Sequence, residues 1–239
     1  MKRPPVVIGN LQLLKRQLRP RGRKLIGVLA VCGFAACIAS TSYAEAPNSS
    51  APSSAPVTRA FLASYRAETA GNFDAALSAL DALPPNRQGS YTVLLRRGWL
   101  AYCGGHHADA IGFYTKAVAA APESVEPRLG LLLPQMALRR WVDVERVARE
   151  VLTRDPGSYL AQMRLGLAQY SLGKFSDAEV SYGKVLALHP ADLEARSGLA
   201  WALLRQRKNG IAEGHFRSIL ELSPQHAAAN EGMALLRKR

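Results

Sequence analysis

A 34-residue period runs through this chain from Val57 to its C-terminus and keeps its phase throughout. Copies begin at residues 57, 91, 125, 159 and 193, with the same residue types at the same offsets. The twentieth position of each copy is a small aliphatic residue: Ala76, Ala110, Val144, Ala178 and Ala212. A fixed period of this length is typical of a solenoid, in which each copy is one unit stacked on its neighbours.

Each copy contains two stretches with helical periodicity. In the copy that begins at Tyr91, apolar residues recur at helical spacing until Gly104 and Gly105, a pair that ends helices. A second periodic stretch follows and ends before Pro122. We therefore expect one helical hairpin per copy, in which small residues at the eighth and twentieth positions let the helices approach closely. An aromatic residue at the twenty-fourth position is expected to fill the gap to the next hairpin.

From Val57 onward the chain resembles the tetratricopeptide repeat family. The family pattern has a small residue at position eight, Gly near fifteen, Ala at twenty, an aromatic at twenty-four and Pro at thirty-two. The copy at 159–192 has all five, as Gly166, Gly173, Ala178, Tyr182 and Pro190. The resemblance implies an all-α, right-handed superhelical solenoid of about five helix-turn-helix hairpins. We expect five repeats within 57–226 (57–90, 91–124, 125–158, 159–192 and 193–226) and a capping helix at 227–239.

Two copies depart from the pattern. In the first, the proline pair at 84–85 should shorten the second helix. In the third, Arg139 and Ala148 stand where Gly and an aromatic are expected, and Pro134 lies inside the first helix. An internal proline costs a helix about 3 kcal/mol, because it removes a hydrogen bond and clashes with the carbonyl four residues earlier. That earlier residue is Gly130, which leaves room for a bend, so we expect a kink here.

The N-terminal region has the layout of a secretory signal peptide. Residues 1–24 hold eight Lys and Arg and no acidic residue, and residues 25–40 are nearly all apolar. That apolar stretch is shorter than the roughly twenty residues of a membrane span. Small residues at Ser42 and Ala44 predict cleavage after Ala44, so 1–44 is an export signal and 45–56 a flexible Ser/Ala/Pro linker.

Two alternatives for the leader stay open. The segment from Phe34 to Cys37 is similar to the lipobox of bacterial lipoproteins, which would make Cys37 a lipidated N-terminus. An uncleaved inner-membrane anchor is also possible, favoured by the long basic leader. We expect an exported, periplasmic protein, which associates with the membrane only through its N-terminus if that is uncleaved or lipidated.

The positive charge of the chain belongs mostly to this leader. The net charge is +13, but eight of the 31 basic residues lie in the leader, which leaves 23 against 18 acidic residues, or +5. No basic run with interleaved aromatics follows the leader, so nucleic-acid binding is not expected. The exported part holds a single cysteine, Cys103, which excludes an intramolecular disulfide there.

No motif for catalysis or cofactor binding is present: neither a phosphate-binding loop nor a paired-cysteine or metalloprotease motif occurs. The nearest candidate is Cys103 with His106 and His107. We interpret the two histidines as part of the loop between two helices and Cys103 as a half-buried small hydrophobic residue. An enzyme that uses Cys103 and His106 is the remote alternative. We expect no catalytic residue, no metal site and no cofactor.

The resemblance implies that the first helices line a concave face and that their second, fifth, sixth, ninth, twelfth and thirteenth positions contact ligands. The residues that we select as a partner-binding groove are Arg96, Trp99, Tyr102, Leu133, Met136, Arg164, Leu167 and Tyr170. The competing interpretation is packing within the hairpins, which we prefer for Trp201. The chaperone-tail clamp of some family members uses Asn and Lys where this chain has Arg96, Trp99, Leu129 and Leu133. The groove therefore suits a more apolar ligand.

These features predict a non-catalytic scaffold or adaptor of the cell envelope that binds a protein or peptide partner in the groove. Aromatic and Arg side chains are enriched at interaction hot spots, which favours this function. The alternative is an accessory protein of exopolysaccharide export or cell-wall assembly that contacts carbohydrate, since Trp and Tyr faces can stack on sugar rings. Arginines would suit an acidic polysaccharide.

Overall fold

The computed structural model describes residues 55–238, and every regular element in this range is a helix. This confirms the expected all-α helical repeat solenoid. The predicted cleavage after Ala44 and the alternative of lipidation at Cys37 lie outside the described residues. None of the described helices combines the length and the apolar composition needed to cross a bilayer.

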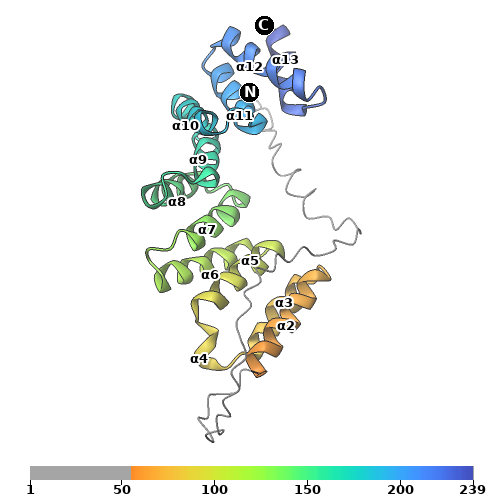
Figure 1. Ribbon diagram of the computed structural model, residues 1–239, viewed down its shortest axis with the longest axis vertical. Helices are drawn as coiled ribbons and strands as arrows, with labels where there is room; N and C mark the ends of the chain where they lie inside the picture. Colours follow the sequence, from red (N-terminus) through yellow and green to blue (C-terminus); the bar gives the residue numbers. More distant parts are fainter. Residues whose placement is uncertain (1–54, 239) are drawn as a thin grey trace, which may run out of the picture. The chain divides into compact units, whose positions relative to one another are not determined.

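The helices follow one another as antiparallel pairs (Figure 1). In chain order they are α2 (Ala55–Thr69), α3 (Phe73–Ala79), the 3-10 helix η1 (Leu80–Ala82), α4 (Pro85–Gln88), α5 (Tyr91–Cys103), α6 (His107–Ala120), α7 (Glu126–Ala137), α8 (Trp141–Arg154), α9 (Tyr159–Ser171), α10 (Phe175–Leu188), α11 (Leu193–Arg205), α12 (Asn209–Leu222) and α13 (Ala227–Arg237). From α5 onward each helix packs on its neighbours in sequence, and α5, α7, α9 and α11 also contact one another in succession. The first helices of successive hairpins therefore lie side by side.

The first hairpin departs from the others at both of its ends. Helix α2 begins at Ala55, inside the segment expected as linker, and Pro56 fits its first turn because an N–H there would have no helical partner. Helix α3 ends at Ala79 and continues as the short η1 before the two prolines. The prediction of a shortened second helix is confirmed.

The fifteenth position of every hairpin adopts a left-handed backbone conformation. Its φ angle is 75° at Gly71, 86° at Gly105 and 79° at Gly173, and it stays positive at Arg139 (56°) and Arg207 (63°). Glycine is favoured at such positions because a Cβ atom crowds the neighbouring carbonyl. The third and fifth hairpins therefore keep the turn of the others, with an arginine in a strained conformation.

Aromatic rings at the twenty-fourth position join consecutive hairpins. The ring of Tyr114 lies against Gly98 of its own hairpin, where an added Cβ atom would stand 2.9 Å from the ring, and a Cβ atom at Gly130 of the next hairpin would overlap it. Tyr182 lies in the same way between Gly166 and Gly198. This confirms the expected role of the aromatic residue between hairpins.

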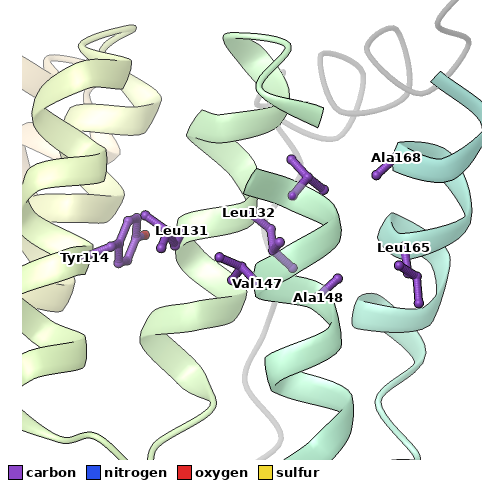
Figure 2. Packing of buried hydrophobic residues seen from close by; sticks show 8 residues of the cluster. Tyr114, Leu131, Leu132, Val147, Ala148, Leu165 and Ala168 are labelled. Carbon is purple, nitrogen blue, oxygen red and sulfur yellow. The ribbon is translucent and has the colours of Figure 1, made fainter. Parts of the chain in front are cut away.

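The third hairpin fills the same space with different residues. It has Leu132 at the eighth position and Ala148 at the twenty-fourth, so the large side chain has moved from the second helix to the first. Both residues are fully buried in a cluster that extends from Tyr114 on α6 to Ala168 on α9 (Figure 2). Interiors pack to a nearly constant density, so a change of volume at one position calls for the opposite change at its neighbour.

Helix α7 runs from Glu126 to Ala137 through the buried Pro134. The kink at this proline stays a prediction. Gly130, however, has a packing function that was not predicted from the sequence. Its missing side chain accommodates the ring of Tyr114 from the preceding hairpin, in addition to any room that it leaves for a bend.

Polar contacts link residues at the sixteenth position to carboxylates of the preceding hairpin. These contacts are a hydrogen bond between His106 and Asp74 (2.7 Å) and the ion pairs Lys174–Glu145 (2.7 Å) and Lys208–Glu179 (2.8 Å). In the third hairpin the equivalent residue is Arg140, which forms no ion pair with any residue in the described range. Glu145 is the most enclosed of the three acids and also accepts a hydrogen bond from Arg149 (2.9 Å). The junction between the third and fourth hairpins is therefore partly polar.

Candidate binding groove

A cavity of about 450 Å³ lies along the first helices of four successive hairpins. Helices α2, α5, α7 and α9 supply nearly all of its lining, and Tyr114 of α6 completes it. The apolar part of the lining consists mainly of Phe61, Leu95, Leu129, Leu133 and Leu160. The cavity is an open groove across stacked helices.

Four of the predicted site residues line this groove: Arg96, Trp99, Leu133 and Arg164. The other four, Tyr102, Met136, Leu167 and Tyr170, are absent from its lining. Of these, Tyr170 packs edge-on against Phe175, with ring centroids 5.4 Å apart, and Met136 packs on the buried cluster of Figure 2. The cavity therefore follows positions two to nine of the first helices rather than their last turn.

The groove also includes residues at the second and fifth positions that were not among the predicted site residues. Leu95 and Leu129 stand at the fifth position, and Glu126 and Leu160 at the second. Both positions belong to the family's contact pattern, so a signal for them was available. The sequence pattern does not single these residues out, because a leucine on an amphipathic helix has the same spacing whether it faces a core or a groove.

Arg96 is held by bonds within the protein. Its Nε donates to Ser64 Oγ (3.0 Å) and its Nη1 to Glu68 Oε2 (3.0 Å), and its guanidinium lies 3.6 Å from the centre of the Tyr65 ring. The Nε1 of Trp99 donates to the other oxygen of Glu68 (2.8 Å). The Arg96 side chain is only 8% exposed. Arg96 and Trp99 thus form a wall of the groove that is bonded to α2, in which Arg96 Nη2 is the one nitrogen left without a hydrogen-bond partner.

Arg164 has a different environment. Its Nη1 donates to the backbone carbonyl oxygen of Leu129 on α7 (3.0 Å), and no acidic side chain in the described range pairs with it. Burial lowers the pKa of the Arg164 guanidinium, and nearby Tyr102 and Tyr114 act in the opposite direction. An arginine remains charged at neutral pH, and it has five N–H donors. Arg164 therefore places a positive charge with unused donors in a mostly apolar groove.

The sixth position, where both arginines stand, is governed by the hairpin before it. After the first hairpin, the residues at this position are Arg96, Gly130, Arg164, Gly198 and Gly232. The preceding twenty-fourth positions are, in the same order, Leu80, Tyr114, Ala148, Tyr182 and Phe216. Each aromatic ring would overlap a Cβ atom at the following sixth position, which explains the three glycines. An arginine occurs only where no ring occupies that space.

The groups considered for catalysis are poorly suited to it. Burial, assisted by the charge of Glu68, raises the pKa of the Cys103 thiol to about 11, so it stays protonated at neutral pH. His106 Nε2 lies 2.7 Å from Asp74 Oδ1 in a hydrogen bond between the first two hairpins. Within the described residues, no three potential metal ligands come together.

A sequence profile of the tetratricopeptide repeat family matches residues 61–125, 136–192 and 164–227. The chain is a tetratricopeptide repeat protein. Tetratricopeptide repeat proteins are generally non-catalytic scaffolds for protein–protein interaction, and the groove lies on the helices that the family pattern indicates. A comparison with curated protein sequences found no match.

Solved structures agree with this assignment. The MamA protein is 21% identical, with a TM-score of 0.65 over 72% of this tetratricopeptide repeat chain and 94% of MamA. A tetratricopeptide repeat protein from Parabacteroides merdae is 20% identical, with a TM-score of 0.70 over 76% of this chain and 72% of that one. MamA from Desulfovibrio magneticus is 19% identical, with a TM-score of 0.65 over 71% of this chain and 97% of that one. At these identities the likeness establishes the fold alone.

Proposed function

We propose that this protein is a non-catalytic scaffold of the cell envelope that holds a segment of a partner protein in the groove of α2, α5, α7 and α9. The observation that carries the proposal is the cavity of about 450 Å³ along four successive first helices. A concave, mainly apolar site with a few placed polar groups is the usual form of a binding site. The envelope location rests on the sequence of residues 1–44.

A protein segment suits this groove better than a carbohydrate. The carbohydrate alternative depended on the faces of Trp and Tyr residues. Trp99 packs against the buried cluster around Leu80 and Leu100, and its indole N–H is bound to Glu68. The leucines of the groove instead offer contacts to large apolar side chains, and Leu160 is 47% exposed.

The groove is tested by photocrosslinking in intact cells. A photoreactive amino acid replaces Leu160 in the groove or, as the control, Val180 on α10, which lies outside the groove and is 58% exposed. We expect an envelope protein to crosslink to position 160 and not to position 180. Equal crosslinking at both positions, or none at 160, would contradict the proposed groove.

The envelope location is tested separately by fractionation and N-terminal sequencing. Cleavage after Ala44 predicts a periplasmic protein that begins at Glu45. A membrane-bound form that is released by Cys37→Ala indicates a lipoprotein, and a full-length membrane-bound form indicates an anchor. Recovery of the full-length chain in the cytoplasm would disprove export while leaving the groove unaffected.

A further inference from the structure

We propose that the groove recognises an acidic side chain of the partner segment at Arg164, with large apolar side chains of the segment on either side of it. This inference rests on the proposed function and adds the chemistry of the partner. It follows from the difference between the two arginines of the groove, which stand at the same position of their repeats but have different partners.

Arg96 has its acid inside the protein and Arg164 does not. Glu68 neutralises Arg96 at 3.0 Å, and the Tyr65 ring covers the guanidinium. Arg164 has only the neutral carbonyl oxygen of Leu129 as a hydrogen-bond partner in the described range. The Arg164 side chain is half-buried, so its charge faces the groove without a counterion, and a carboxylate can accept two parallel N–H bonds from one guanidinium. The missing counterion is the feature that a partner can supply.

The surroundings of Arg164 define the rest of the segment. Leu129 and Leu133 of α7 and Leu160 of α9 line the same groove. Apolar side chains of the partner would cover these leucines and remove water from the ion pair, which strengthens it. One acidic residue, Glu126, also lines the groove; it is exposed and accepts a hydrogen bond from the Tyr91 hydroxyl (3.0 Å). Its charge disfavours a second acid at that end and so restricts the register of the segment.

A carboxylate fits better than a phosphate. Among the described residues, the other basic one in the lining is Arg96, whose charge Glu68 already balances. A phosphate carries close to two negative charges at neutral pH and is usually met by several donors or cations. A single free guanidinium matches the single charge of an Asp or Glu side chain.

The experiment selects peptides from a random displayed library on the purified native protein and, in parallel, on Arg164→Gln. The most enriched peptide is then synthesised with both ends blocked, as the acidic form and with its Asp or Glu replaced by the amide. We expect the native protein to enrich an acidic residue between large apolar residues, and Arg164→Gln to lose this preference. The acid-to-amide change should weaken binding to the native protein by about ten- to one-hundredfold and binding to Arg164→Gln only slightly.

Controls separate this inference from the groove itself. Arg217→Gln removes an exposed arginine on α12, outside the groove, and should leave the affinity unchanged. Helical circular dichroism and thermal unfolding establish that Arg164→Gln is folded. If the peptides lose affinity on Leu160→Glu but bind equally well as acid and amide, Arg164 has no such role while the groove function stands. The inference would also be overturned if neither Arg164→Gln nor Leu160→Glu changed the affinity of the peptides, or if the library yielded no binding peptide. Displacement of the peptides by millimolar inorganic phosphate would overturn it as well.

Discussion

Gly130 on α7 lies beneath the ring of Tyr114 from the preceding hairpin, so one hydrogen atom there makes room for the contact between two repeats. Several other helical glycines have no such neighbour: a Cβ atom at Gly112 on α6 would meet nothing within 4 Å. The sequence alone does not distinguish these two kinds of glycine. The distinction arises from packing between hairpins, which joins residues far apart in the sequence.

Gly130→Ala should therefore destabilise the protein although alanine is the better helix former. Overpacking of a filled interior costs about 1–3 kcal/mol, which exceeds the helix preference of alanine of about 1 kcal/mol. The matched control Gly112→Ala should stabilise by up to about 1 kcal/mol, since only the helix preference acts there. Urea unfolding followed by circular dichroism measures both. Shifts of the same sign for the two variants would show that the Tyr114 contact adapts at little cost.

Arg139→Gly should stabilise the protein. Its φ of 56° is unfavourable for a residue with a side chain by about 1–2 kcal/mol, and the greater freedom of glycine in the unfolded chain returns part of that. The expected net gain is about 0.5–1 kcal/mol, measured as a higher melting temperature. Arg140→Gly removes the same charge from an adjacent exposed residue with φ of −79° and should not stabilise. A gain in both variants would point to charge, not backbone strain.

At the scale of the element, the ends of the helices could be predicted from the sequence. The compensation of a small residue on one helix by a large residue on its partner could not. Glycines at the fifteenth position indicated where first helices end, and the prolines at 84–85 indicated the short α3. Arg139 and Ala148 looked like defects of the third repeat, yet Leu132 replaces the volume that Ala148 lacks. A pattern that scores each position separately cannot detect such compensation, because the two residues are meaningful only as a pair.

The ion pair between the third and fourth hairpins gives a pH-dependent element. Burial alone would raise the pKa of Glu145, but hydrogen bonds from Lys174 and Arg149 lower it below its ordinary value. A lowered pKa in the folded state means that the stabilisation is present at neutral pH and is lost as the pH falls through the folded-state value.

Glu145→Gln should thus lower the free energy of unfolding at pH 7 by about 1 kcal/mol, a modest value because Lys174 and Arg149 are about half exposed. The difference from the native protein should shrink as the pH falls through the lowered folded-state pKa of Glu145, where the glutamate itself becomes protonated. Glu213→Gln breaks an exposed pair within α12 and should cost only about 0.3–0.5 kcal/mol. A Glu145→Gln effect that is constant from pH 7 to pH 3 would exclude a role for its charge.

At the scale of the whole described unit, each hairpin is stabilised by its contacts with the next hairpin. Helix α13 covers the last ring, because Phe216 is fully buried and a Cβ atom at Gly232 would overlap it. The period in the sequence was enough to predict this solenoid order. It was not enough to locate the groove, which depends on how four first helices come together and ends before α11.

Removal of residues 227–239 should loosen the last hairpin first. Exposure of the Phe216 ring costs about 1.5–3 kcal/mol, and in a solenoid this loss falls mainly on the adjacent repeat. Trp201, whose ring centroid lies 5.7 Å from that of Phe216, reports this region when Trp99 and Trp141 are replaced by Phe. We expect the truncation to lower the urea midpoint reported by Trp201 more than the midpoint reported by Trp99 in a variant where Trp99 is the single tryptophan. Equal shifts would mean that the unit unfolds in one step.

A ring at the twenty-fourth position excludes a side chain at the following sixth position. This exclusion affects how such a protein can evolve by mutation. A mutation that shrinks a buried aromatic residue frees a site on the binding face of the neighbouring repeat, where a later mutation can place a charge. Ala148 followed by Arg164 is such a combination, and Leu80 followed by Arg96 is another. New specificity can therefore originate in the interior, before any surface residue is altered.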